Sequence, residues 1–290
     1  MRYSQLRAFD AVAREGSFSK AADRLGVTQP AVTLQVRALE DDHGISLVRR
    51  STRALGLTEA GQELHLLTRR MFDIEAEIAD YLAQSGDLTR GSLLLGADGP
   101  HVILKLVAAF QSRYPGLGLR VALGNARATW HDLLDQKVDA AVLANPPEDS
   151  RVRVLPLGRQ DLMALLPRGH PLAARSKVDL AALLDHPVIL REAGSNTRRV
   201  IEAELARTGL RLKPALELGS REAVCEAVAT GLGLSFIYAS EITEDPRTQV
   251  VTVIGLEQSS LDTLVYLAGN ETRRPLKALV EIAAGLFAPS

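Results

Sequence analysis

Apolar and polar positions in the first part of the chain follow the three-to-four-residue spacing of amphipathic helices. Residues 4–15 predict one helix, and residues 17–25 predict a second that ends at Gly26, where a left-handed backbone suits glycine. Residues 28–44 predict a third helix, with Pro30 in its first turn, where no N–H is needed. Two helices separated by a tight glycine turn are typical of a helix-turn-helix, in which the second helix projects from its domain.

The hydrophobic pattern then changes twice. Residues 45–58 contain short β-prone pieces on either side of an arginine-rich tip, which predicts a small hairpin, or wing. From Thr58 to about Gln84 the apolar residues are spaced alternately by four and three positions, as in a coiled-coil seam. The residues of this predicted seam are Ala60, Leu64, Leu67, Met71, Ile74, Ile78 and Tyr81. A helix that packs along its own domain is the alternative, but strict heptad spacing with charges elsewhere favours a partner helix.

A polar, glycine-containing stretch at residues 85–92 predicts a domain boundary. Beyond it, strand-like and helix-like segments alternate. The order strand, helix, strand, helix, strand over residues 92–144 predicts a parallel sheet. A second set of alternating segments begins near His186, which predicts two α/β lobes with a cleft between them.

The expected fold class therefore combines a mainly helical winged helix-turn-helix, a long linker helix and a two-lobed α/β domain. The expected bounds are residues 1–58 for the winged helix-turn-helix, 59–87 for the linker and dimerisation helix, and 88–290 for the two-lobed domain. Within that domain, lobe I is expected at about 91–161 and 268–290, and lobe II at about 162–267.

Composition narrows the class of protein without identifying it. Apolar residues make up 46% of the chain and charged residues 24%, as in ordinary globular proteins, and no uncharged apolar run is long enough to span a membrane. With Cys225 as the single cysteine no internal disulfide can form, and the charged N-terminus lacks the apolar core of a signal peptide, so we expect a cytoplasmic protein. Residues 1–57 carry nine Lys and Arg against six Asp and Glu, a net charge of +3 in a chain whose total is −1. A basic head on an acidic remainder favours a polyanionic partner.

The exposed start of the third predicted helix carries side chains that are suited to reading DNA. Gln29 can form two hydrogen bonds with adenine, and threonines can contact a phosphate or a thymine methyl group. Arginines on this helix and on the wing can neutralise phosphates. The predicted DNA-binding residues are Ser17, Ser19, Thr28, Gln29, Pro30, Thr33, Leu34, Arg37, Arg50 and Arg53. The alternative is a pair of packed helices with no DNA role, which the basic wing and the long helix behind it disfavour.

A loop at the start of another predicted helix favours an anion in the two-lobed domain. The stretch from Gly194 to Arg198 offers backbone N–H groups, and Ser195, Asn196 and Thr197 add side-chain donors. Arg198 adds a positive charge. Simple capping of the helix by Ser195 or Thr197 is the alternative, with equal weight.

Asp98 follows the first strand of lobe I at its carboxyl end, where ligands of α/β sheets bind. Its carboxylate can meet an ammonium group, or it can cap the helix that begins at Pro100. An anion site on one lobe that faces an acid on the other suits a zwitterion. Two asparagines follow the next two strands and complete the candidate set. The predicted effector-binding residues are Asp98, Gly99, Pro100, Asn125, Asn145, Ser195, Asn196, Thr197 and Arg198.

Patterns that would indicate an enzyme or a metalloprotein are weak. The six histidines show no metal-ligand spacing, and Cys225 has no histidine close in sequence, so packing is its preferred role. The stretch GLGLS at residues 231–235 lacks the third glycine of a dinucleotide-binding fingerprint. We therefore predict no catalytic residue, no metal and no cofactor other than a small-molecule effector.

The stretches LRAFDAVAREGSFSKAADRLGVTQPAVTLQVRALE and LVRRSTRALGLTEAG resemble the LysR-type transcriptional regulators, densely over residues 3–65, and SREAVCEAVATGLGLSFI extends the likeness into the C-terminal half. The resemblance implies a winged helix-turn-helix that binds double-stranded DNA, a linker helix that forms a dimer, and a two-lobed effector domain like a periplasmic binding protein. It also implies a tetramer and an interrupted inverted repeat as the DNA site, with RNA polymerase as a further candidate partner. Leu34 departs from the family, which often has a polar residue there, and this favours contact with a thymine methyl group.

A narrower similarity concerns MRYSQLRAFDAVAREGSFSKAA, LLLGADGPHVILKLVAAF, LREAGSNTRRV and ELGSREAVCEAVATGLG. These stretches look like the subgroup of LysR-type regulators associated with aminoethylphosphonate catabolism, which implies a phosphonate that bears an amine as the effector. The sequence as a whole predicts a ligand-controlled transcriptional regulator. The alternative is a small-molecule-binding or enzymatic α/β protein that uses the helix-turn-helix only as an interaction module.

Overall fold

The computed structural model describes residues 1–50, 55–82 and 91–288. Arg53 lies outside these ranges, as does most of the predicted linker at residues 85–92, and the side chains of Arg50 and Tyr81 are not described. The chain divides into two compact units, Met1–Gly91 and Ser92–Ser290. No helix in the described ranges has the length and apolar composition needed to cross a membrane.

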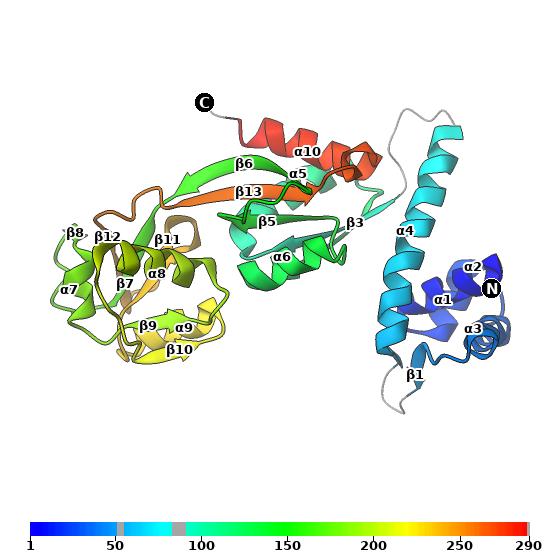
Figure 1. Cartoon of the computed structure of the whole chain (residues 1–290), viewed down its shortest axis with the longest axis horizontal. Coiled ribbons are helices and arrows are strands. Elements are labelled where there is room, and N and C mark those ends of the chain that lie inside the picture. Colours follow the sequence, from blue (N-terminus) through cyan, green and yellow to red (C-terminus); the bar gives the residue numbers. More distant parts are fainter. Residues whose placement is uncertain (51–54, 83–90, 289–290) are drawn as a thin grey trace. The chain divides into compact units, whose positions relative to one another are not determined.

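Three helices, a hairpin and a long helix form the first unit, in the order that the sequence predicts (Figure 1). They are α1 (Tyr3–Glu15), α2 (Phe18–Leu25), α3 (Gln29–His43), β1 (Val48–Arg50), β2 (Leu55–Leu57) and α4 (Glu59–Leu82). The first three helices end at Gly16, Gly26 and Gly44, whose φ angles are 60°, 66° and 65°. A residue with a Cβ atom is strained at these angles, so the glycine positions determine where each helix stops.

The core of the first unit forms where α1, α2 and α3 meet. Phe9 of α1 and Val36 of α3 are fully buried, and the small Ala22 of α2 lets the helices cross closely. Val32 is buried at the corner between α2 and α3. These are the residues that a helix-turn-helix needs to set its angle, and they confirm the predicted motif.

The wing and α4 are held to this core through the backbone around Leu47. Glu40 Oε1, near the end of α3, accepts hydrogen bonds from the amides of Leu47 and Val48 at 2.8 and 3.1 Å. Gly61 of α4 lies so close to the same segment that a Cβ atom there would be 2.0 Å from the carbonyl oxygen of Leu47. A larger residue at position 61 would therefore push the long helix away from the wing.

The long helix α4 has two apolar sides with different surroundings. Leu64 and Phe72 pack against the core of the first unit. Other apolar residues of the predicted seam project into solvent, and Leu67 is 60% exposed. We refer to these as the exposed seam, which consists of Leu67, Met71, Ile74 and Ile78. An apolar stripe at heptad spacing is the surface that a partner helix requires.

Lobe I of the second unit is a five-stranded sheet with helices on both faces (Figure 1). The strand order is β4-β3-β5-β13-β6, in which β3, β4 and β5 are parallel and β13 is antiparallel to both of its neighbours. The strands are β3 (Ser92–Ala97), β4 (Gly118–Leu123), β5 (Ala140–Ala144), β6 (Val152–Gln160) and β13 (Ser260–Leu267). Helices α5 (Pro100–Arg113) and α10 (Arg274–Leu286) cover one face, and α6 (Ala126–Leu134) covers the other.

Lobe II contains a four-stranded sheet in the order β11-β7-β12-β8 and a parallel pair formed by β9 and β10. The strands are β7 (Leu162–Pro167), β8 (Lys177–Val178), β9 (Ile189–Arg191), β10 (Leu216–Leu218), β11 (Ser235–Tyr238) and β12 (Thr248–Val253). The helices are α7 (Leu180–Leu184), α8 (Asn196–Thr208) and α9 (Arg221–Ala229), and the 3₁₀ turn η1 (Ala239–Glu241) follows β11. A buried apolar cluster unites the sheet with α7 and α8.

The predicted lobe boundary and one strand need correction. Residues 260–267, which the sequence assigns to lobe II, form β13 and lie between β5 and β6 in the sheet of lobe I. The sequence pattern misses β6, because Pro156 and several charged residues interrupt its apolar run. An edge strand tolerates proline, since one of its sides needs no N–H donors. Lobe I therefore comprises residues 92–160 and 260–288, and lobe II comprises residues 161–259.

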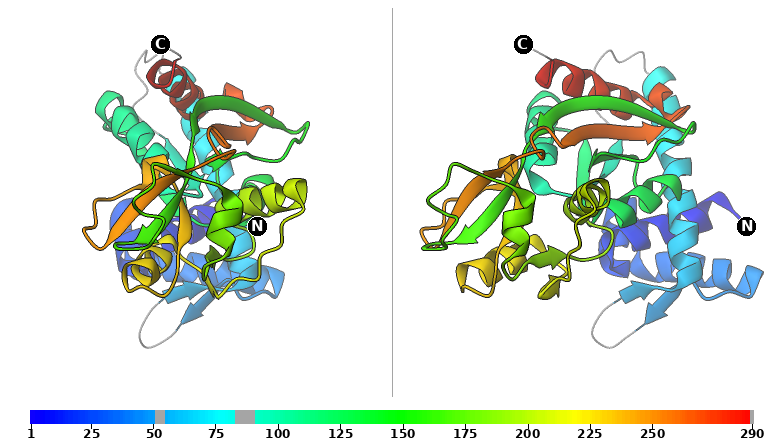
Figure 2. Two further views of the ribbon diagram at one scale, coloured as in Figure 1. Left: turned by 90° about the vertical axis from the view of Figure 1, so that its left-hand side faces the viewer. Right: turned by 60° about the vertical axis from the view of Figure 1, so that its left-hand side comes forward.

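Two segments cross between the lobes (Figure 2). One joins β6 to β7 through Asp161, and the other joins β12 to β13 through residues 254–259. The amide of Gln258 donates to Asp161 Oδ1 at 2.7 Å, and the amide of Leu162 donates to the carbonyl of Leu256 at 3.1 Å. The two crossings are thus bonded to each other and form one hinge-like connection, next to the cleft between the lobes.

Candidate functional site

The N-terminal turn of α3 presents its side chains outward, as the sequence predicts. Thr28 is the N-cap residue, but its hydroxyl accepts no capping hydrogen bond. The predicted readers that project from this helix are the exposed Thr28, Gln29, Pro30, Leu34 and Arg37, with Thr33 half-buried among them. An exposed helix start with free hydroxyl and amide groups is suited to the base edges of a major groove.

Residues of α2 support this surface in two ways. Ser17 caps α2, because its hydroxyl accepts a hydrogen bond from the amide of Lys20 at 3.4 Å. Ser19 Oγ donates to Gln29 Oε1 at 3.2 Å, which orients the amide group of Gln29. The predicted phosphate contacts of Arg50 and Arg53 fall on side chains outside the described part of the chain, and they stay predictions.

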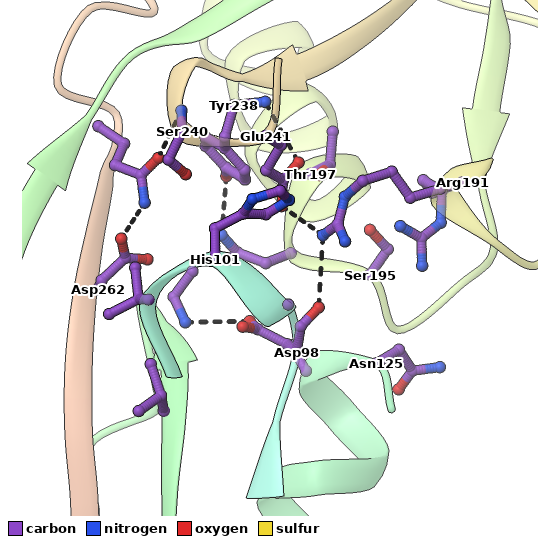
Figure 3. Close-up of a pocket in the computed structure, with 18 residues that line it drawn as sticks. Asp98, His101, Asn125, Arg191, Ser195, Thr197, Tyr238, Ser240, Glu241 and Asp262 are labelled. Atoms are coloured by element: carbon purple, nitrogen blue, oxygen red, sulfur yellow. Dashed lines mark hydrogen bonds and ion pairs between the residues drawn. The ribbon is translucent and has the colours of Figure 1, made fainter. Parts of the chain in front are cut away.

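A cleft lies between the two lobes of the second unit, and polar side chains from both lobes line it (Figure 3). Lobe I contributes residues from the turn after β3, the start of α6, the end of β6 and the start of β13. Lobe II contributes residues from the end of β9, the starts of α8 and α9, and the turn after β11. The labelled residues are Asp98, His101, Asn125 and Asp262 on lobe I, and Arg191, Ser195, Thr197, Tyr238, Ser240 and Glu241 on lobe II.

Asp98 is held at the cleft by the neighbouring strand. Its Oδ2 atom accepts a hydrogen bond from the amide of Ala144 at 3.0 Å. Burial raises the pKa of Asp98 to about 6, and the charges of Asp262 and Glu241 add to this effect while the bond from Ala144 opposes it. Asp98 does not cap α5, whose N-cap residue is Gly99. A cation beside this carboxyl group would lower its pKa and stabilise its charged form.

The start of α8 is buried at the cleft and lacks a side-chain cap. Ser195 is the N-cap residue, and both Ser195 and Thr197 are buried. Within the described residues, no helix amide donates to either hydroxyl, so the simple capping that was the alternative to ligand binding is not found. The first amides of α8 also lack acceptors in this part of the chain, which leaves them for an anion.

Asn196, the first residue of α8, is used for packing between the lobes. Its Nδ2 atom donates to the hydroxyl of Tyr238 at 2.8 Å and lies 3.5 Å from Ser260 Oγ, at the start of β13. Its Oδ1 atom accepts from Arg199 at 2.5 Å. The side-chain amide of Asn196 therefore has partners at both its nitrogen and its oxygen, and these contacts position the start of α8 beside the cleft.

Two arginines at the cleft were missed by the sequence reasoning. Arg191 donates to Glu192 at 2.8 and 3.0 Å, and Arg221 forms an ion pair with Glu241 in which both side chains are mostly buried. Arg191 ends β9, so the rule that selected Asp98, a polar residue at the carboxyl end of a strand, could have found it. Arg221 begins α9, and only the packing of that helix against lobe II brings it to the cleft.

Asp262 and Gln160 extend the polar network to the crossing strands. Burial raises the pKa of Asp262 to about 6, although a hydrogen bond from Gln160 opposes the shift. Gln160 Oε1 also accepts from the amide of Ser240 in lobe II at 3.2 Å. This chain of contacts joins β13 of lobe I to the turn after β11 of lobe II, so it is sensitive to the spacing of the lobes.

Two predicted effector residues have other roles. Asn145 does not line the cleft, because its Nδ2 atom donates to the carbonyl of Ser259 at 3.0 Å and its Oδ1 atom accepts from the amide of Leu261 at 2.8 Å. It ties the end of β5 to the start of β13. Arg198 points away from the cleft and pairs with Glu202 at 2.7 Å. Both predictions were wrong for the same reason: a side chain at the end of a strand or helix can point toward the cleft or away from it, and its position in the sequence does not decide which.

Three further residues keep structural roles. Asn125 lines the cleft, but its Oδ1 atom caps α6 by accepting from the amide of Ala128 at 2.9 Å. Pro100 begins α5 and is not among the residues that line the cleft. Cys225 packs, half-buried, against an apolar cluster of lobe II, and burial raises the pKa of its thiol.

No three His, Cys, Asp or Glu side chains in the described ranges converge as a metal site.

A winged helix-turn-helix on a long helix, followed by a two-lobed domain with a polar cleft, defines the class of DNA-binding regulators that respond to a small molecule. Residues 3–62 match the family model "Bacterial regulatory helix-turn-helix protein, lysR family", and residues 86–287 match "LysR substrate binding domain". The chain belongs to the LysR family of transcriptional regulators. It is a regulator with an effector-binding domain and not an enzyme.

Known proteins agree with this assignment. The RuBisCO operon transcriptional regulator of Allochromatium vinosum is 33% identical over 255 residues, which cover 87% of this chain and 84% of that protein. The regulator CbbR of Sinorhizobium medicae is 33% identical over 246 residues, or 84% of this chain and 79% of that protein. A full-length cysteine variant of OxyR from Pseudomonas aeruginosa has a similar structure, with a TM-score of 0.71, 24% identity and coverage of 98% and 95% of the two chains. At that identity the structural likeness supports the fold alone.

Proposed function

We propose that this regulator binds an interrupted inverted repeat through paired reading heads, and that a small anion bearing an ammonium group controls it from the interlobe cleft. The observation that carries the effector proposal is the opposition of two groups whose hydrogen bonding is incomplete. One is the uncapped start of α8 with Ser195 and Thr197, and the other is Asp98 with its raised pKa. 2-Aminoethylphosphonate is the lead candidate, because it offers an anion to the first group and a cation to the second.

The cleft has to open before such a molecule can enter. Only about 30 Å³ is free between its side chains, which is room for a few water molecules at most. Arg221 and Glu241 occupy the cleft as an ion pair with each other. We infer that the anionic group of the effector replaces Glu241 as the partner of Arg221, and that the lobes move apart to admit the effector. The effector would then shift the balance between two lobe arrangements by its different affinities for them.

Calorimetric titration of the full-length protein tests the effector. The ligands are 2-aminoethylphosphonate, ethylphosphonate, sulfate and a dicarboxylate. We expect the amine-bearing phosphonate to bind most tightly, because it alone satisfies both sides of the cleft. Asp98→Ala is expected to remove the preference for the ligand that bears an amine. Thr197→Ala is expected to weaken the binding of every anion by about 1 kcal/mol, the usual contribution of one hydrogen bond.

A matched control lies on the same helix. Thr208, at the far end of α8, donates its hydroxyl to the carbonyl of Glu204, and Thr208→Ala is expected to bind all ligands as wild type does. Equal affinities for ethylphosphonate and 2-aminoethylphosphonate would remove Asp98 from the site. Unchanged anion binding in Thr197→Ala would remove the start of α8.

The exposed seam of α4 supports the proposal that two reading heads are paired. The double variant Leu67→Glu with Met71→Glu places like charges in the seam of a dimer. It is therefore expected to be monomeric. It is also expected to lose about 100-fold or more in operator affinity, because each head then binds alone. Gln62→Glu with Ala79→Glu is the control, since both positions of α4 are exposed and lie outside the exposed seam. Sedimentation that shows wild-type assembly of the seam variant, with wild-type operator affinity, would contradict the proposal.

Base reading is assigned to the start of α3. An operator selected from random DNA with the purified protein supplies the specific duplex. Gln29→Ala is expected to cost about 1–3 kcal/mol on this duplex and to relax discrimination, because one base contact is lost. Arg37→Ala is expected to weaken specific and random duplexes alike and to lower the salt dependence. Gel shifts across salt concentrations measure both, and unchanged discrimination in Gln29→Ala would refute its assignment.

The wider setting of the protein follows from the same proposal. We expect a tetramer built from two seam-paired dimers, with RNA polymerase as a further candidate partner. A DNA-binding regulator acts where its operator lies, so we place the protein in the cytoplasm.

A further inference from the structure

A second cavity lies beside the effector cleft and is also bordered by both lobes. The amide of Arg127 in lobe I donates to the carbonyl of Gly194 in lobe II at 3.1 Å, and both residues line this cavity. Ala126, Ala144 and Ser195 line both the cavity and the effector cleft, so the two spaces are neighbours. The second cavity measures about 380 Å³, against about 30 Å³ for the cleft, which is enough for a ligand with one ring.

One wall of the second cavity is apolar. Lobe I supplies Trp130, Leu143, Pro146 and Pro147 to it. Trp130 packs into the core of lobe I and is only 8% exposed, so its ring is held rigidly and only a part of it borders the cavity. A fixed aromatic ring between prolines is a surface against which a flat apolar group packs well.

Positive charge lies at the edge of the same cavity. Arg198 is neutralised by Glu202 at 2.7 Å, and Arg199 donates to the carbonyls of Ala144 and Asn145. The guanidinium group of Arg127 has no hydrogen bond or ion pair with any residue in the described ranges. Glu202 is the single acid among the described residues that line the cavity. A free cation beside an apolar wall therefore favours a monoanion with an apolar body.

We propose that this cavity binds an aromatic monocarboxylate, with its ring against Trp130, Pro146 and Pro147 and its carboxylate on Arg127. The carboxylate and the planar guanidinium group match in geometry and can form two parallel hydrogen bonds. The ligand differs in chemistry from the zwitterion proposed for the cleft, because no free acid faces Arg127. It would contact both lobes, through Pro146 on one side and Gly194 on the other.

The chain offers a direct reporter for this cavity. Trp130 is its only tryptophan, so intrinsic fluorescence of the full-length protein reports on the proposed site. Titration with phenylacetate is expected to produce a saturable change in this emission. Phenylacetamide lacks the charge and acetate lacks the ring, and each is expected to bind about 10-fold more weakly or worse, the equivalent of one charge-assisted hydrogen bond.

Two variants identify the cation. Arg127→Gln is expected to weaken the binding of phenylacetate about 10-fold, because a neutral amide replaces the guanidinium group. Arg113→Gln is the matched control, since Arg113 is an exposed arginine at the end of α5 in the same lobe and does not line the cavity. Equal affinities of these two variants, equal affinities for phenylacetate and phenylacetamide, or an emission that does not respond to phenylacetate would each overturn the proposal.

The Asp98→Asn variant separates this site from the effector cleft. It is expected to lose the preference for 2-aminoethylphosphonate over ethylphosphonate and to bind phenylacetate with wild-type affinity. A loss of phenylacetate binding in Asp98→Asn would show that the aromatic ligand occupies the cleft, and it would overturn the second site. Failure of the phosphonate alone would refute the proposed effector and leave the phenylacetate result standing.

Discussion

Two aspartates that are withdrawn from solvent, Asp10 in the first unit and Asp98 in the second, have opposite surroundings. Both carboxylate oxygens of Asp10 are engaged, since Arg14 Nε lies 2.6 Å from Oδ2 and Thr68 Oγ1 donates to Oδ1 at 3.0 Å. Burial would raise the pKa of Asp10, but His65, Arg14 and Thr68 together lower it. The result is a closed network that ties α1 to α4.

Asp98 receives only one backbone hydrogen bond, from Ala144, and burial raises its pKa to about 6. The comparison teaches how to tell a structural acid from a candidate binding group. An acid whose partners are all supplied by its own unit stabilises the fold in its charged form. The charged form of an acid that is buried with too few partners is destabilised, and a ligand can supply the missing hydrogen bonds or the opposite charge.

The largest expected effect is on the closed network. Asp10→Asn removes the charge that faces Arg14 and breaks the contacts with α4, so it is expected to destabilise the first unit by about 3 kcal/mol. Hydrogen exchange of the amides in α1 and α4 measures this, since Trp130 lies in the second unit. Asp41→Asn, at an exposed position of α3, is the control and is expected to leave exchange unchanged. Equal exchange in the two variants would mean that Asp10 is not structural.

The corresponding change at Asp98 is expected to have the opposite sign. Asp98→Asn keeps an oxygen for the amide of Ala144 and removes a charge that burial disfavours. It is expected to raise the free energy of unfolding of the second unit by about 1–2 kcal/mol at neutral pH. Chemical denaturation followed by Trp130 emission measures it, with the exposed Asp185→Asn as control. A loss of stability in Asp98→Asn would break the comparison.

The pH dependence of the two units is expected to differ in the same way. Asp98 and Asp262 have pKa values of about 6 in the fold, against 3.8 for an ordinary aspartate, so the native state keeps protons that the unfolded state loses. Stability from these two groups is therefore present below about pH 4 and is lost as the pH rises to about 6. The lowered pKa of Asp10 works the other way, because its contribution is present above about pH 4 and is lost as the pH falls through the lowered value.

Denaturation of wild type and Asp98→Asn from pH 4 to pH 7 tests this dependence. The difference in stability between the two proteins is expected to grow with pH by about 1 kcal/mol or more. A constant difference across this range would show that Asp98 titrates at its ordinary pKa.

The smallest expected effects concern two serines at helix starts. Ser220 caps α9 by accepting from the amide of Ala223 at 3.1 Å, and Ser220→Ala is expected to cost about 1 kcal/mol. Ser195 stands at the same position of α8 without capping it, so Ser195→Ala is expected to change stability by less than about 0.5 kcal/mol and to weaken anion binding. Equal losses of stability in thermal unfolding would show that Ser195 is an ordinary cap.

The first unit could be predicted almost element by element, because its signals are local. Gly26 and Gly44 mark helix ends through the conformation of a single residue, and heptad spacing marks α4 within one helix. For the same reason Ser195, Thr197 and Asp98 could be selected as candidates, since each lies where a strand or helix begins or ends. The sequence could not tell that Asn145 and Arg198 turn away from the cleft, because their partners at Ser259 and Glu217 are distant along the chain.

The sequence by itself determined the order of the elements, the helix-turn-helix with the exposed side chains of α3, the apolar stripe of α4 and the family. These depend on residues within a few positions of one another, where backbone geometry and periodicity act directly. Only the tertiary structure decided that β13 returns to lobe I, that Arg221 joins Asp98 at one cleft, and that Trp130 and Arg127 border a second cavity. Each of these depends on contacts between segments far apart in the chain, and no local pattern encodes which face of a strand or helix such a segment will meet.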